Sequence, residues 1–325
     1  MTDLSNETGN GVVALADIGG TNVRFALLAD GITGSITHIE VGAHKDFADA
    51  FAAFMARQSG RAAVRRALLA VAGVVEGERC ALTNNPWVID AGELRARFGL
   101  TDVRLVNDFE AIAWSLPRLK PGDLRPIGGS KPVAQAPMVV LGPGTGLGVA
   151  AYVPLADGGL VLRGEGGHST LPSGSAREDA IIGHLRQRYG HVSAERVLSG
   201  PGLENLYRAI AALDSLSAPK RSAAEITEAA LAGQCAASAA ALDTFCAMLG
   251  DVASNFALAF GAQGGVFMAG GILPRLGDHL PKTQFRARFD AKGRMRRYVE
   301  QIPVYLILRD DPAFVGLQRL TGQPA

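Results

Sequence analysis

The sequence predicts an α/β protein with two domains, and three observations lead to this prediction. The chain has 325 residues, about twice the ~150 that are typical of a single domain. Predicted helices and strands alternate along the first half, as they do in a layered α/β unit. A glycine-rich turn between two predicted strands near the N-terminus also has a counterpart about halfway along the chain. Such a repetition of one supersecondary unit indicates two related halves.

The composition excludes several other classes of protein. Hydrophobic residues make up 48% of the chain and charged residues 19%, a balance that argues against disorder. Lys and Arg number 32 against 31 Asp and Glu, so the net charge is +1. A nucleic-acid binder normally carries a strongly positive surface, and we therefore expect no nucleic-acid partner.

Cysteine spacing and hydropathy bear on the compartment. The three cysteines have no C-x-x-C spacing: Cys80, Cys235 and Cys246. This argues against a disulfide framework or a zinc ribbon and fits a reducing cytosol. Residues 1–11 lack the basic start and apolar run of a secretory signal. The stretch Cys235–Phe260 is apolar but contains Asp243 and Asp251, which are costly in a bilayer. We expect a soluble cytoplasmic protein without a membrane partner, with this stretch as a buried helix.

The first half of the chain is predicted to begin with a β-hairpin. Its strands are Val12–Asp17 and Val23–Leu28, joined by turn residues. An amphipathic helix follows from Asp46, with an apolar face of Phe47, Phe51, Phe54 and Met55. The next predicted elements are strand Ala67–Val75, helix Ala91–Phe98 ended by Gly99, strand Val103–Val106 and helix Glu110–Leu116.

The second half is predicted to begin after a Pro- and Gly-rich boundary segment, Lys120–Pro137. A second hairpin pairs Met138–Leu141 with Leu147–Val153. The later predicted elements are helices Arg177–Tyr189 and Leu203–Leu213, a helix opened by the capping box Ser222-x-x-Glu225, a long helix ending near Gly261, strands Gly265–Ala269 and Val304–Leu308, and a helix starting at Asp311-Pro312.

The turn of the first hairpin is the first candidate phosphate site. Asp17-Ile18-Gly19-Gly20-Thr21 places consecutive peptide N–H groups and a hydroxyl beside a carboxylate. Because the carboxylate of Asp17 and a phosphate repel each other, we expect Asp17 to reach Mg²⁺ through water, with no direct metal ligand from the protein. An ordinary Gly-Gly hairpin is the alternative.

The loop Gly142-Pro143-Gly144-Thr145-Gly146-Leu147-Gly148 is the second candidate phosphate site. It does not match the dinucleotide pattern G-x-G-x-x-G, and a strand rather than a helix is predicted to follow it. The chain also contains no G-x-x-x-x-G-K-[ST] motif. Two glycine hairpins would therefore take the place of a P-loop.

Candidate catalytic and substrate residues follow three strands or turns. Asn107-Asp108 ends a predicted strand, where Asp108 could act as a general base and where a helix cap is the alternative. Glu165-Gly166-Gly167-His168, with Glu195 further on, offers polar groups for a hydroxyl-rich ligand; a structural histidine and a glutamate in a first helical turn are the alternatives. Gly270-Gly271 follows a strand and could admit an aromatic ring against the backbone, or it could cap a helix.

Taken together and in this order, these motifs resemble those of the bacterial glucokinase family, in the hexokinase, actin and Hsp70-like ATPase superfamily. The similar segments are Leu15–Thr21, Leu105–Phe109, Gly142–Gly148, Glu165–His168, His191–Leu203 and Ile302–Leu306, and the resemblance spans residues 12 to 318. Thr83-Asn84 before Trp87 also matches a family signature. The family often has Pro where Ala72-Gly73-Val74 stands here, and the zinc motif C-x-C-G-x-x-G-C of a related group is absent.

The resemblance implies the two-domain actin-like ATPase fold, with ribonuclease H-like cores and ATP and sugar in an interdomain cleft. A small domain would comprise residues 12–118 and 310–325, and a large one residues 119–309. The implied activity is ATP-dependent phosphorylation of the D-glucose 6-hydroxyl, with Mg²⁺ and with a homodimer as the common assembly. The alternatives are a kinase for mannose or an amino sugar, and an actin-like or Hsp70-like nucleotide-gated module.

The resemblance also assigns roles to residues. Asp108 would be the general base. The hydroxyl partners of the sugar would be Asn107, Asp108, Glu165, His168 and Glu195. The phosphates of the nucleotide would be held by Ala16, Asp17, Ile18, Gly19, Gly20, Thr21, Gly142, Gly144, Thr145 and Gly146. Gly270 and Gly271, proposed above from the glycine pair after a strand, complete the predicted nucleotide site.

Overall fold

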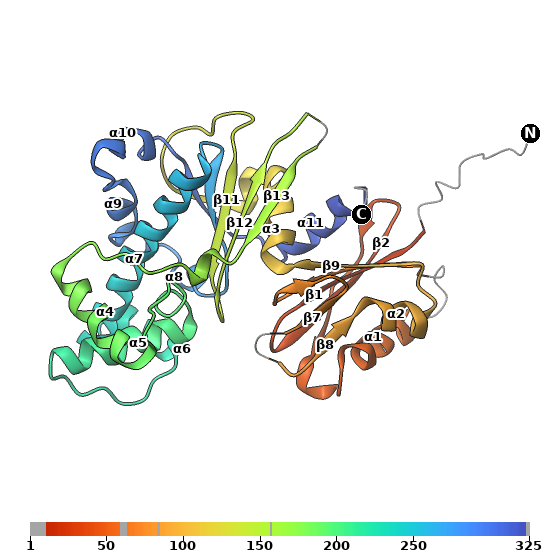
Figure 1. The fold of residues 1–325 in the computed structure, drawn as a ribbon, viewed down its shortest axis with the longest axis horizontal. Coiled ribbons are helices and arrows are strands. Elements are labelled where there is room, and N and C mark those ends of the chain that lie inside the picture. The colour runs from red at the N-terminus through yellow and green to blue at the C-terminus, as the bar shows by residue number, and fades with distance from the viewer. Residues whose placement is uncertain (1–10, 59–63, 83–84, 157, 323–325) are drawn as a thin grey trace, which may run out of the picture. The chain divides into compact units, whose positions relative to one another are not determined.

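The chain forms two compact units, each with its own sheet and core (Figure 1). The structure, a computed structural model, describes residues 11–58, 64–82, 85–156 and 158–322. Unit 1 comprises Met1–Arg118 and Asp310–Ala325, and unit 2 comprises Leu119–Arg309. The signature Thr83-Asn84 lies outside the described residues.

The main sheet of unit 1 has the strand order β3-β2-β1-β5-β9, with β4 also paired to β2. The strands are β1 (Val13–Ile18), β2 (Asn22–Ala29), β3 (Ile32–Thr33), β4 (Thr37–Glu40), β5 (Arg66–Val71) and β9 (Asp102–Asn107). Strands β1 and β2 form the predicted antiparallel hairpin, whereas β1, β5 and β9 are parallel.

The predicted strand Ala67–Val75 is too long. The chain turns after Val71, where the N–H of Gly73 donates to the carbonyl of Val71. Val75 instead begins a small separate sheet of β6 (Val75–Glu76), β7 (Arg79–Ala81) and β8 (Val88–Asp90). An apolar run does not reveal a turn that consists of Ala, Gly and Val, and for this reason the sequence pattern missed it.

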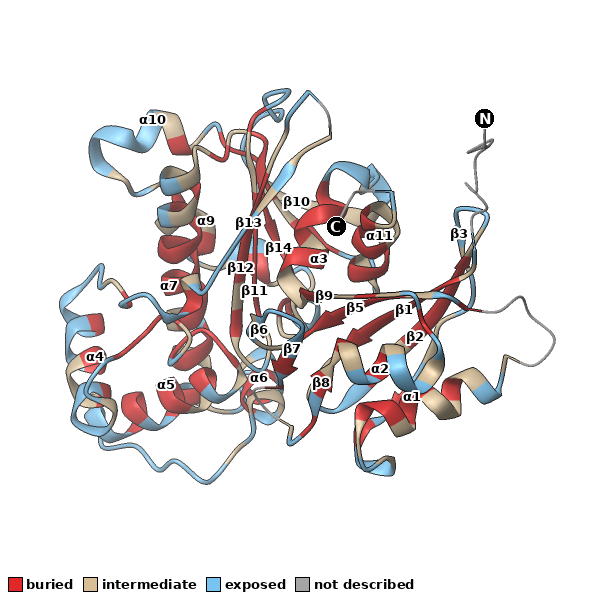
Figure 2. Cartoon of the chain, turned by 45° about the vertical axis from the view of Figure 1, so that its right-hand side comes forward, coloured by how far each residue is buried: buried red, intermediate tan, exposed pale blue. Residues whose placement is uncertain are grey.

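Helices cover both faces of the unit 1 sheet. The helices α1 (Phe47–Ala56) and α2 (Ala91–Phe98) share a core with the inward residues of β1, which include Ala14 and Ile18. The other face of β1 is covered by α11 (Pro312–Leu320), which packs on α3 (Asp108–Ser115). Figure 2 shows buried residues in α1 and in the strands of this sheet. Because strand side chains alternate, Asp17 lies on the α11 face.

The sheet of unit 2 has the strand order β10-β15-β14-β11-β12-β13. Its strands are β10 (Leu124–Gly128), β11 (Met138–Pro143), β12 (Leu147–Val153), β13 (Leu160–Gly164), β14 (Gly265–Met268) and β15 (Val304–Ile307). Strand β10 lies within the segment for which the sequence suggested only a boundary. The order β13-β12-β11-β14-β15 repeats the order β3-β2-β1-β5-β9, with the same parallel and antiparallel pairs. The predicted relation between the two halves is therefore confirmed.

The helices of unit 2 pack around the long helix α7 (Ala236–Phe260). Helices α5 (Gly200–Leu213), α6 (Ala223–Leu231), α9 (Phe285–Asp290) and α10 (Arg296–Val299) contact α7 directly, whereas α4 (Ala176–Tyr189) packs on α5 and α8 (Leu273–Leu276) packs on β15. Helix α7 is long and apolar enough to cross a membrane, but 72% of its most apolar window is buried inside the protein. It is the buried core helix that the sequence predicted, and it ends at Gly261 in the left-handed conformation.

Candidate active site

The turn of the β1–β2 hairpin is tight. The N–H of Gly19 donates to the carbonyl of Asn22 over 3.0 Å, and the side-chain amide of Asn85 donates to the carbonyl of Gly20 over 3.4 Å. Ala16 and Ile18 are buried in the strand before the turn, while Thr21 is exposed. The turn thus offers backbone and the hydroxyl of Thr21 to a ligand, on a strand that is fixed in the core.

Asp17 has an ion-pair partner that the sequence motifs did not assign. Its Oδ2 lies 2.6 Å from Nη2 of Arg24, the residue directly opposite it in the hairpin. Burial raises the pKa of Asp17; the Arg24 guanidinium opposes this shift, and the nearby Asp311 adds to it. The hairpin register could have revealed this pair, since the turn places residues 17 and 24 across from each other.

Asn107 and Asp108 stand where β9 meets α3. The side-chain oxygen of Asn107 accepts hydrogen bonds from the N–H groups of Phe109 and Glu110, at 2.9 and 3.3 Å. The helix-cap alternative is thus confirmed for Asn107. Asp108 is the first residue of the helix, is half-buried, and accepts a hydrogen bond from the N–H of Phe109 at 2.9 Å. The helix start favours a negative charge there, which is the form of a carboxylate that accepts a proton.

Gly73, in the turn Ala72-Gly73-Val74, contacts this same region. Its carbonyl accepts a hydrogen bond from the side-chain amide of Asn107 at 3.2 Å. A Cβ atom at Gly73 would lie 2.7 Å from the carbonyl oxygen of Ala81 and 2.9 Å from Sγ of Cys80. Burial, with a smaller contribution from Asp108, raises the pKa of Cys80 to about 11. The absence of a side chain at position 73 lets this loop lie beside the strand that carries Cys80.

In unit 2 the loop Gly142–Gly146 is held from two sides. The N–H of Gly144 donates to the carbonyl of Gly146 over 2.8 Å. The N–H of Gly200, at the start of α5, donates to the carbonyl of Gly144, also over 2.8 Å. Gly270 has φ +90°, and a Cβ atom there would lie 2.4 Å from the carbonyl oxygen of Pro143. Thr145 and Gly271 are exposed. The structure therefore brings the Gly270 turn onto the second glycine loop.

Three side chains named from the sequence converge in unit 2. His168 lies between two carboxylates, with Nε2 3.8 Å from Oε2 of Glu165 and Nδ1 3.9 Å from Oε1 of Glu195. Glu165 and His168 are exposed, which excludes a buried structural role for His168. Glu195 lies in a hydrogen-bonded turn before α5, in which the N–H of Leu198 donates to the carbonyl of Ala194 over 2.7 Å, and not in one of the helices of unit 2.

Glu195 also joins this trio to the second glycine loop. Its Oε2 accepts a hydrogen bond from the N–H of Leu147 at 2.9 Å, and a Cβ atom at Gly146 would lie 2.5 Å from the same oxygen. The N–H of Glu195 donates to the carbonyl of Gly167 over 2.8 Å. One carboxylate therefore contacts the phosphate-loop candidate while its other oxygen faces His168.

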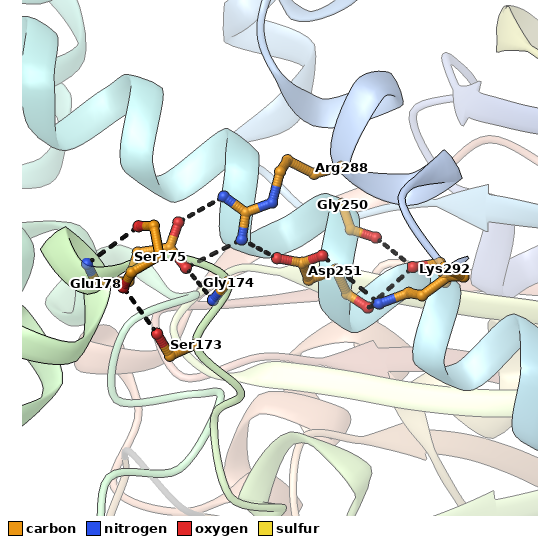
Figure 3. Close-up of polar contacts among 9 residues, drawn as sticks. Ser173, Gly174, Ser175, Glu178, Gly250, Asp251, Arg288 and Lys292 are labelled. Atoms are coloured by element: carbon orange, nitrogen blue, oxygen red, sulfur yellow. Dashed lines mark hydrogen bonds and ion pairs between the residues drawn. The ribbon is translucent and has the colours of Figure 1, made fainter. Parts of the chain in front are cut away.

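The segment after His168 is anchored by a network of ion pairs in unit 2 (Figure 3). Arg288 contacts both oxygens of Glu178, at 2.6 and 3.0 Å, and also pairs with Asp251. Nζ of Lys292 lies 3.5 Å from Oδ1 of Asp251, and Oε2 of Glu178 accepts a hydrogen bond from the N–H of Gly174 at 2.6 Å. Although burial opposes ionisation, hydrogen bonds from Arg288 and Gly174 hold the pKa of Glu178 below its ordinary value.

Comparison with known proteins assigns the family. A family model described as Glucokinase matches residues 14–323. A glucokinase of Paramagnetospirillum magneticum is 46% identical over 315 residues, which cover 96% of this chain and 98% of that protein. A glucokinase of Nitrobacter hamburgensis is 42% identical over 310 residues, which cover 95% of this chain and 97% of that protein. The chain belongs to the glucokinase family.

Solved structures agree with this family assignment. The crystal structure of a glucokinase from an Antarctic psychrotroph superposes with a TM-score of 0.84 at 34% identity, covering 95% of this chain and 98% of that one. A glucokinase from Balamuthia mandrillaris, solved in complex with glucose, has a TM-score of 0.80 at 21% identity, covering 98% and 96%, and supports the fold alone. The predicted two-domain actin-like ATPase fold is confirmed.

Proposed function

We propose that this glucokinase-family chain transfers the γ-phosphoryl group of ATP to the 6-hydroxyl of D-glucose, giving glucose 6-phosphate and ADP. The observation that carries the proposal is the position of Glu195, which contacts His168 on one side and the second glycine loop on the other. A sugar kinase must place a hydroxyl-rich ligand next to a phosphate, and a nucleotide-gated module has no need for this pairing.

Asp108 is proposed as the general base. Phosphoryl transfer needs orientation, charge neutralisation and a group that accepts the proton of the attacking hydroxyl. The half-buried carboxylate of Asp108 at the start of α3 suits that role. Asn107, Glu165, His168 and Glu195 would hydrogen-bond the sugar hydroxyls together with Asp108.

The two glycine turns would hold the phosphates of ATP. Their backbone N–H groups and the exposed hydroxyls of Thr21 and Thr145 are donors suited to phosphate oxygens. Among the described residues, no group of three or more His, Cys, Asp or Glu side chains could hold a metal ion. Mg²⁺ usually binds substrate phosphates and keeps several waters, so it would be carried to the site by ATP. Asp17 would reach one of those waters, and the ion would neutralise charge on the transferred group.

The remaining parts of the proposal concern organisation and place. Unit 1 and unit 2 would act as the small and large domains of the kinase. We propose a homodimer, because it is the common assembly of the family. We propose the cytoplasm as the compartment, because the cysteine spacing fits a reducing environment.

A sugar panel tests the proposed activity. ADP release from Mg²⁺-ATP is measured with glucose, mannose, fructose, glucosamine, N-acetylmannosamine and no sugar. Turnover that depends on glucose and exceeds that with the other sugars supports the proposal. Turnover that is highest with mannose or an amino sugar would assign a different hexose. ATP hydrolysis that no sugar accelerates would replace the kinase with a nucleotide-gated module.

A pair of variants tests the base. Asp108→Asn keeps the size of the side chain but removes the proton acceptor, and we expect kcat to fall by about 10²- to 10⁴-fold with little change in the KM for glucose. Asp102→Asn, at the other end of β9, is the matched control and should leave kcat within about twofold. Equal kcat values for the two variants would remove Asp108 from the base role.

A further inference from the structure

One arginine joins the first phosphate hairpin to the C-terminal helix. Nη2 of Arg24 lies 2.6 Å from Asp17, and its Nη1 lies 2.5 Å from Oδ1 of Asp311. Asp17 and Arg24 are opposite each other in the hairpin, whereas Asp311 is 287 residues away from Arg24 in sequence. The side chains of both aspartates are largely buried, with exposed fractions of 11% and 20%.

Asp311 occupies the N-cap position of α11 but does not act as a cap. Its side chain makes no hydrogen bond to the helix N–H groups, and its Oδ1 instead accepts a hydrogen bond from Nη1 of Arg24. Asp is among the preferred capping residues, and losing a cap normally destabilises the helix. The residue therefore serves the contact with the hairpin in place of its local role.

Helix α11 in turn packs closely on the helix that carries Asp108. A Cβ atom at Gly316 would lie 1.7 Å from the carbonyl oxygen of Ala111 in α3. Further along, the guanidinium of Arg319 lies 5.2 Å from the centre of the Trp114 ring. The backbones of α11 and α3 can approach this closely only because residue 316 has no side chain.

We infer that Arg24 and Asp311 are positioning residues for nucleotide-phosphate binding, and that α11 is their support. The two nitrogens of the Arg24 guanidinium reach two carboxylates at once, which fixes Asp17 at the phosphate turn and ties that turn to the start of α11. This inference rests on the proposed function, because it assigns the phosphates to the hairpin turn.

The fork of the arginine is the feature that the test targets. A lysine keeps the charge but has a single nitrogen, so it cannot occupy both positions. Arg24→Lys leaves a single nitrogen for the two carboxylates, and Asp311→Asn removes the charge that the guanidinium pairs with, so each disrupts the link while preserving approximate size. We expect each to weaken the binding of ADP, measured by titration calorimetry in the presence of Mg²⁺, by about tenfold.

The double variant shows whether the two residues act as one unit. Because either change alone breaks the same link, Arg24→Lys combined with Asp311→Asn should weaken ADP binding no more than about twofold beyond the stronger single variant. In turnover assays of the single variants, KM for ATP should rise by about the same factor of ten as ADP binding weakens, while KM for glucose changes less than about twofold.

A second Arg–Asp pair on the same sheet provides the matched control. Nε of Arg66 lies 3.2 Å from Oδ2 of Asp102 between β5 and β9, and both side chains are about 40% exposed. Arg66→Lys and Asp102→Asn should change ADP binding by less than about twofold. Comparing thermal stability across both pairs separates loss of positioning from loss of fold.

The outcomes distinguish this inference from the proposed function. Three results would each overturn the inference. The effects on ADP binding could be no larger than those of the control pair, the effects of the two changes could be fully additive, or KM for glucose and KM for ATP could rise equally. An unmodified chain that does not bind ADP would also overturn it. If the unmodified chain binds ADP with the expected coupling yet shows no glucose-dependent turnover, the proposed function fails and the positioning role stands.

Discussion

The anchoring network around Arg288 predicts a large loss of stability in one variant. Arg288→Met removes the guanidinium that contacts both oxygens of Glu178 and also contacts Asp251. The Glu178 side chain is only 6% exposed, and removing one partner of a buried ion pair costs about 3–5 kcal/mol. Lys292 still faces Asp251, and the N–H of Gly174 still reaches Glu178. We therefore expect the free energy of unfolding to fall by about 3 kcal/mol, the lower end of that range.

The pH dependence of this loss follows from the direction of the pKa shift. The pKa of Glu178 is lowered in the folded protein, so its ion pair stabilises the fold fully above the ordinary glutamate pKa of ~4.3. This contribution is lost as pH falls through the lowered value. In Arg288→Met the unpaired carboxylate instead destabilises the fold until it is protonated. The difference in stability between the two proteins should therefore shrink between pH 7 and pH 4.

Urea unfolding followed by circular dichroism measures this effect. The matched control is Arg177→Met, in the same helix α4 as Glu178. Nη2 of Arg177 lies 2.6 Å from Oδ2 of Asp214, but the Arg177 side chain is 46% exposed and that of Asp214 is 37% exposed. Exposed pairs contribute about 0–1 kcal/mol. Equal losses in the two variants, or a loss in Arg288→Met that does not shrink toward pH 4, would refute the reasoning.

Three further predictions concern the two units. His168→Ala should raise KM for glucose by about tenfold or more and leave KM for ATP within about twofold, because hydroxyl-binding groups act on the sugar alone; a change confined to ATP would remove His168 from the sugar site. Gly146→Ala would place a Cβ 2.5 Å from Oε2 of Glu195, so steady-state kinetics should show a raised KM for glucose, and an unchanged value would contradict the role of Glu195. Gly316→Ala should force α11 away from α3 and lower the free energy of unfolding by about 1–3 kcal/mol in urea titrations, with a neutral effect contradicting the close packing.

Local signals in the sequence predicted much of the fold. Helix α2 ends at Phe98 as predicted, because Gly99 adopts the left-handed conformation that stops a helix. The capping box at Ser222 and the proline at position 312 also mark the starts of α6 and α11 correctly. Each of these signals depends on residues that are neighbours in the chain.

Contacts between distant residues could not be predicted in this way. Leu147 and Glu195 are 48 residues apart, and the hydrogen bond between them depends on how β12 packs against the turn before α5. Asp311 was predicted only as a helix start, yet its side chain binds Arg24. Residue types and motif resemblance together named the sugar-site candidates Glu165, His168 and Glu195, but their mutual distances required the structure.

The most direct test of the account compares glucose with 6-deoxyglucose as the acceptor. The two sugars differ only in the hydroxyl that the reaction is proposed to phosphorylate. With Mg²⁺-ATP and the unmodified protein, the account predicts rapid ADP release with glucose, formation of glucose 6-phosphate, and only the no-sugar rate with 6-deoxyglucose. Equal ADP release with both sugars, or phosphorylation of glucose at another position, would contradict it.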